Sequence, residues 1–96
     1  SGSINMPHLA EQVLAEGKGD FIGLGRPLWA DPLWPKKARE GREEDVIPCI
    51  RCNDGCLDRT FFNFRGVSCS VNPNLGREGE FPILPAAKPR KVAVMG

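Results

Sequence analysis

The sequence predicts an α/β fold in its first half, followed by a cysteine-rich segment without regular structure. A helical apolar stripe runs through residues 7–16, and a short apolar stretch follows at 20–24. From residue 48 to about residue 77 no period of either kind is sustained, and all four cysteines fall in this segment. Helices and strands that alternate through short links are typical of α/β architecture.

The first element is an amphipathic helix over residues 7–16. Pro7 fits the first turn of a helix, where its missing N–H is not needed, and Gly17 fits the left-handed residue that ends one. These two signals therefore predict both ends of the helix. The apolar residues recur three and four positions apart and share one face: Met6, Leu9, Ala10, Val13 and Leu14.

The next predicted element is a short strand at residues 20–24. The sequence there, DFIGL, does not alternate between apolar and polar residues, as expected for a parallel strand covered on both faces. Asp31 is then a candidate cap for a one-turn element at 31–34. Pro35 would remove a hydrogen bond from a helix that had already begun, so we expect a separate short helix near 36–41.

Little regular structure is predicted after residue 41. Residues 42–47 are mostly charged and indicate a solvated connection, and three prolines within 78–90 indicate an extended linker. Residues 92–94 predict another strand. We expect the chain to be a fragment of a longer protein, because it stops where this strand would enter its turn.

Charge and hydropathy argue against several classes of function. The 96 residues contain 13 Lys and Arg against 12 Asp and Glu, a net charge of +1. This balance gives no electrostatic reason to expect binding to nucleic acid or an anionic membrane. No apolar run approaches the roughly 20 residues of a membrane span. Because no signal-peptide pattern is found, we predict a reducing, cytoplasmic location.

The cysteines are the strongest chemical signal. They follow the spacing Cys-x2-Cys-x3-Cys, then twelve residues, then a fourth cysteine: Cys49, Cys52, Cys56 and Cys69. Three clustered thiolates and one distant one favour an iron–sulfur cluster, because three close ligands can cap one face of the cube. Structural zinc is the main alternative, since four thiolates are also a common zinc set. Disulfides and free or catalytic thiols are weaker interpretations.

A second candidate site lies where the predicted strand 20–24 ends. Gly25 lets backbone amides approach an anion, and Arg26 supplies a bidentate fork. Gly2 and Ser3 form a small-residue turn in the equivalent place before the first helix. Two neighbouring turns of this kind hold phosphate groups in (β/α)8 barrels. An ordinary loop is the alternative at both turns.

Four stretches of sequence together resemble a known enzyme family. The string DFIGLGRPL at 20–28 resembles the old yellow enzyme family, and CIRCNDGCL at 49–57 narrows the resemblance to its iron–sulfur branch. This branch includes 2,4-dienoyl-CoA reductase, 2-enoate reductase and trimethylamine dehydrogenase. CSVNP at 69–73 resembles the fourth-ligand segment, and KPRKVAVMG at 88–96 resembles the entry to the dinucleotide-binding domain.

The resemblance implies a division of the chain into four parts. Residues 1–41 would be the last two βα units of a TIM (β/α)8 barrel that binds FMN, and 42–77 the [4Fe–4S] cluster segment. Residues 78–90 would be a linker, and 91–96 the first strand of a Rossmann-like domain for FAD and NAD(P). By position, the FMN phosphate would contact Gly2, Ser3, Gly25 and Arg26.

The resemblance also implies an activity. Electrons would pass from NAD(P)H through FAD and the [4Fe–4S] cluster to FMN, which reduces an activated C=C bond of an enoate or enoyl-CoA-type substrate. The gap of three residues between Cys52 and Cys56 favours the reductases over the amine dehydrogenase. Ser3 stands where some reductases carry an arginine. No catalytic residue is identified in this chain. A zinc-stapled interaction module and a self-contained electron carrier are the rival functions.

Overall fold

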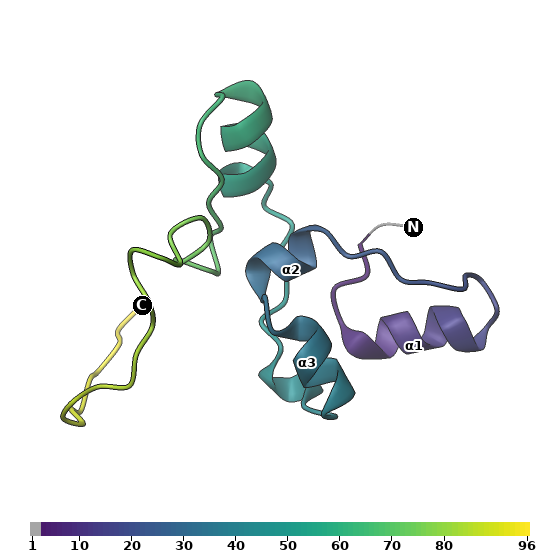
Figure 1. Cartoon of the computed structure of the whole chain (residues 1–96), viewed down its shortest axis with the longest axis horizontal. Coiled ribbons are helices and arrows are strands. Elements are labelled where there is room, and N and C mark those ends of the chain that lie inside the picture. The colour runs from purple at the N-terminus through teal and green to yellow at the C-terminus, as the bar shows by residue number, and fades with distance from the viewer. Residues whose placement is uncertain (1–2) are drawn as a thin grey trace.

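The computed structural model describes residues 3–96. Gly2, one of the predicted phosphate contacts, lies outside the described residues. In Figure 1 the helices of the first part of the chain lie near one another, the helix in the middle of the chain projects away from them, and the last part of the chain forms a long loop. The elements in chain order are α1 (Pro7–Ala15), α2 (Arg26–Ala30), α3 (Trp34–Arg39), the 3-10 turn η1 (Glu43–Asp45) and the π-helix η2 (Asp54–Phe62).

Helix α1 confirms the first predicted element to within one residue. Pro7 occupies the first turn, and Gly17 follows the helix with a φ of +65°. That left-handed value is one that glycine adopts without a steric penalty. The helix buries Pro7 and Ala10 and leaves its opposite face to solvent.

The two predicted strands at 20–24 and 92–94 are not paired in the structure. A strand is defined by the hydrogen bonds that it makes with a neighbour, and neither segment has a partner strand among residues 3–96. Phe21 is 92% exposed and Val94 is 91% exposed. The α/β class with barrel and Rossmann-like parts therefore stays a prediction.

Helices α2 and α3 differ from the sequence prediction between residues 25 and 41. Helix α2 begins directly after Gly25 and includes Arg26 and Pro27. Its five residues are too few to show an apolar repeat, so the sequence did not predict it. The predicted turn at 31–34 is present, since the Trp34 N–H donates to the Asp31 carbonyl at 3.1 Å. Helix α3, however, begins at Trp34 rather than near residue 36, so Pro35 lies in its first turn. A proline there costs no intrahelical hydrogen bond.

A small core joins α1 to α3 and to the start of the cysteine segment. Ala10, Trp34 and Val46 are each 6% exposed and form its centre. The Trp34 indole Nε1–H donates to the Asn5 carbonyl at 3.0 Å, which ties α3 to the chain before α1. Partly buried neighbours complete this core: Ile4, Met6, Ile22, Leu24, Leu28 and Ala38. Because Val46 lies three residues before Cys49, the core also fixes where the cysteine segment starts.

The π-helix η2 is the largest departure from the prediction that residues 48–77 are irregular. Its N–H groups bond five residues back, from Asp58 to the Asn53 carbonyl at 2.9 Å and from Asn63 to the Asp58 carbonyl at 3.1 Å. Such wide turns are rare and are frequently found at functional sites. Within residues 3–96, no helix has the length and apolar character that crossing a membrane requires.

Candidate functional site

All four cysteines line one cavity. Cys49 and Cys52 lie in the extended segment before η2, Cys56 lies in the first turn of η2, and Cys69 lies on the segment that returns past it. All four are free thiols, and only Cys52 is classed as exposed. All four residues line this cavity, but no three metal-binding side chains among residues 3–96 lie close enough together to hold a single ion.

Two left-handed residues shape the loop that carries Cys52. Arg51 and Asn53, on either side of it, have φ values of +59° and +62°. Non-glycine residues adopt this region infrequently, and asparagine does so more readily than most. The backbone is therefore left-handed on both sides of Cys52, and this shapes the loop that presents its thiol.

Gly55 allows the segments that carry Cys56 and Cys69 to approach each other closely. The Ser68 N–H donates to the Gly55 carbonyl at 2.8 Å. A Cβ atom on Gly55 would lie 2.6 Å from Ser68 Oγ and 2.7 Å from the Ser68 carbonyl oxygen. Because Gly55 directly precedes Cys56 and Ser68 directly precedes Cys69, this contact holds the third and fourth cysteines on one cavity.

The Cys52 thiol is poised toward its thiolate form. Its Sγ lies 3.3 Å from Ser70 Oγ. This hydrogen bond is the main reason that the pKa of Cys52 falls below its usual value, with a smaller contribution from the backbone at Asp54. Thiolates are the form in which cysteine binds metals.

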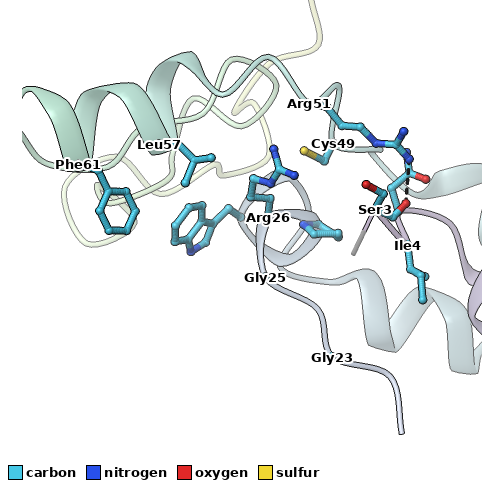
Figure 2. Close-up of a pocket in the computed structure, with 12 residues that line it drawn as sticks. Ser3, Ile4, Gly23, Gly25, Arg26, Cys49, Arg51, Leu57 and Phe61 are labelled. Carbon is cyan, nitrogen blue, oxygen red and sulfur yellow. Dashed lines mark hydrogen bonds between the residues drawn. The ribbon is translucent and has the colours of Figure 1, made fainter. Parts of the chain in front are cut away.

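A second pocket contains three of the predicted phosphate contacts. Ser3, Gly25 and Arg26 all line it. In Figure 2 the dashed line marks a hydrogen bond, 2.8 Å long, that Arg51 Nη2 donates to the Ser3 carbonyl. Arg51 therefore brings a second cation to this pocket. Ser3 has a φ of +67°.

The two cavities share a wall. Arg26, Trp29 and Cys49 line both of them, and Figure 2 shows Arg26 and Cys49 on the second pocket. The Arg26 guanidinium donates through Nη1 to Asn53 Oδ1 in the loop after Cys52. A group bound in one cavity would thus be separated from a group bound in the other by single side chains.

Asp31 accepts a hydrogen bond from the Leu33 N–H at 3.0 Å, as expected of the predicted cap. Asp31 and Asn72 also anchor the ends of the cysteine segment, which the sequence did not indicate. Asp31 is 3% exposed, and its carboxylate accepts from the Ile47 N–H at 3.0 Å and from Lys37 Nζ at 2.6 Å. Asn72, three residues after Cys69, donates to the Trp29 carbonyl at 2.8 Å. The Asp-Pro and Asn-Pro pairs were visible signals, but a turn or cap explains each of them equally well.

The ionisation of Asp31 follows from this environment. Burial would raise the pKa of its carboxyl group, but the ammonium of Lys37 and the N–H groups of Ile47 and Leu33 together lower it below its usual value. Asp31 is therefore a carboxylate at neutral pH, paired with a lysine whose side chain is 12% exposed.

Comparison with known proteins finds bacterial oxidoreductases. The chain is 52% identical over 93 residues to a metal reductase of Desulforamulus reducens and 50% identical over 97 residues to an NADH oxidase of Thermoanaerobacter brockii. It is 42% identical over 96 residues to a cinnamate reductase of Clostridium sporogenes.

These alignments cover nearly all of this chain but only a small part of each relative. They take in 97%, 99% and 100% of the chain and 14%, 15% and 14% of the three relatives. No family model matches the chain. The relationship is thus to one segment of longer oxidoreductases.

Proposed function

We propose that this chain, a relative of one segment of bacterial oxidoreductases, supplies a [4Fe–4S] site and part of an FMN phosphate site to an enzyme that uses NAD(P)H to reduce activated C=C bonds. One observation carries the proposal. The cavity lined by all four cysteines adjoins the pocket lined by Ser3, Gly25 and Arg26. A one-electron centre beside a flavin suits a reductase whose flavin receives its electrons through an iron–sulfur cluster.

The donor set of the first cavity fits a cubane cluster. Each cysteine of such a cluster binds a different iron, so its ligands are spaced around a volume. Cys49, Cys52, Cys56 and Cys69 line one cavity as free thiols. When bound, the cluster would supply one-electron transfer. The chain would contribute four thiolates, with the Ser70 hydroxyl holding one of them by a hydrogen bond.

The residues of the second pocket suit a phosphate group. Arg26 and Arg51 offer planar guanidinium groups, which bind phosphate oxygens in a bidentate manner. Arg51 also holds the Ser3 backbone in place, because its guanidinium donates a hydrogen bond to the Ser3 carbonyl. The flavin would supply hydride transfer to the substrate, and these side chains would bind and orient its phosphate end.

The setting of these two sites is also proposed from the resemblance. Residues 3–41 carry an apolar groove between α1 and α3, lined in part by Ile22 and Leu24. Large exposed apolar surfaces are typical of contact faces, and neighbouring barrel strands would cover this one. Residues 91–96 would enter the FAD and NAD(P) domain, the enzyme would be cytoplasmic, and its substrate would be an enoate or enoyl-CoA-type compound.

The same four thiols also fit the rival function, a zinc-stapled structural module. Anaerobic reduction of the full-length gene product distinguishes the two. We expect NADH or NADPH to bleach a flavin absorbance band, and an enoate such as cinnamate to restore it. A colourless protein that carries zinc and does not react with NAD(P)H would contradict the proposed function.

A further inference from the structure

Arg26 stands between the two cavities and is held there by one residue. Its guanidinium lines both the cysteine cavity and the phosphate pocket. Asn53 Oδ1 accepts a hydrogen bond from its Nη1. In the part of the chain that the structure describes, Arg26 makes no other side-chain hydrogen bond, so its remaining N–H groups are available to an anion in the pocket.

Asn53 belongs to the loop that carries the cysteines. It directly follows Cys52 and has a φ of +62°. Its carbonyl accepts from the Asp58 N–H at 2.9 Å, the first hydrogen bond of η2. The position of the Asn53 amide is therefore set by the same turn that presents Cys52 and Cys56.

We propose that Asn53 is a positioning residue that couples the two sites. The inference rests on the proposed function. Filling the cysteine site fixes Cys52 and Cys56, which orders Asn53 between them. Asn53 then holds Arg26 toward the phosphate pocket, so the anion no longer has to immobilise a flexible arginine. By linkage, FMN in the pocket strengthens retention of the cluster by the same factor.

The size of this coupling follows from the side chain that is ordered. Immobilising one rotamer-rich side chain on binding weakens affinity by about two- to twelvefold. The cluster-loaded protein should therefore bind FMN tighter than the cluster-free protein by a factor in that range.

Asn53→Gly is the variant that isolates this contact. Glycine accepts a φ of +62° without strain, so the loop keeps its conformation and only the side-chain amide is lost. Asn63→Gly is the matched control, because Asn63 caps the other end of η2 and bonds Asp58 rather than Arg26.

The experiment measures the FMN dissociation constant of the full-length protein by flavin fluorescence, with and without the cluster, and iron per chain beside it. In the wild type and in Asn63→Gly the cluster should tighten FMN binding; in Asn53→Gly the two constants should coincide. The ratio of the two constants is insensitive to a general loss of stability. If the cluster still tightens FMN binding in Asn53→Gly, or if this effect is lost in Asn63→Gly as well, the inference is wrong. The proposed function would not be affected by either result. Absence of both cofactors from the wild type would overturn the proposed function as well.

Discussion

Gly55→Ala is expected to loosen the cysteine site more than any other single-methyl substitution near it. Gly55 is buried, and its carbonyl accepts hydrogen bonds from the backbone N–H and the hydroxyl of Ser68. These two residues stand immediately before Cys56 and Cys69. Adding a methyl group at this contact therefore pushes apart the two segments that bring the third and fourth cysteines together.

The magnitude follows from the distances. The new Cβ would lie 2.7 Å from the Ser68 carbonyl oxygen, whereas ordinary contact begins at 3.4 Å. The backbone around Ser68 must therefore move by about 0.7 Å, and it cannot swing aside as a flexible side chain would. Overpacking of this kind costs about 1–3 kcal/mol, and 1.4 kcal/mol corresponds to about a tenfold change in an equilibrium.

The assay measures how fast a chelator removes iron from the full-length protein under anaerobic conditions. The loss of visible absorbance reports this rate. We expect Gly55→Ala to lose iron about tenfold faster than the wild type, from the range above. Gly66→Ala is the control, since a Cβ there meets nothing within 4 Å. Equal rates for the two variants would refute the argument that close approach at Gly55 assembles the site.

Two other side chains give predictions of the same kind. Asp31→Asn leaves the Lys37 ammonium without its counter-charge and should destabilise the protein by about 3 kcal/mol. The control is Asp20→Asn at an exposed position, which should change stability by less than about 0.5 kcal/mol. Denaturant unfolding measures both changes. Because the pKa of Asp31 is lowered by folding, its contribution is present above the unfolded value of about 3.9 and is lost as pH falls through the lower folded value. An acid unfolding step below about pH 4 that is unchanged in Asp31→Asn would contradict this assignment. Asn72→Ala leaves the Trp29 carbonyl without its donor, should cost about 1 kcal/mol, and should speed iron loss; an unchanged rate would show that this anchor does not hold the last cysteine.

How far the fold could be predicted depended on the length of each element. Helix α1 carries an apolar stripe over nine residues and a proline in its first turn, so its limits could be predicted closely. Helix α2 has only five residues, too few to show a helical period, and its Gly-Arg-Pro start is equally typical of a loop. The π-helix η2 was not predicted, because its apolar residues fall in two short clusters, 56–57 and 61–62, rather than in a stripe sustained over several turns.

The gathering of the four cysteines could be predicted from the sequence, but the residues that support them could not. The spacing of the cysteines indicated one shared site, and the structure brings all four to one cavity. The residues that hold this arrangement act over long sequence separations, as Asp31 does with Ile47 and Arg26 with Asn53. Such contacts depend on how the chain folds back on itself, and no local pattern specifies them.

The central claim is that Cys49, Cys52, Cys56 and Cys69 together hold one [4Fe–4S] cluster. The most direct test is a count of iron, zinc and acid-labile sulfide per chain in the full-length protein, purified without oxygen. We expect about four irons and four sulfides per chain and no stoichiometric zinc. One zinc per chain without sulfide, not displaced by iron, would contradict it.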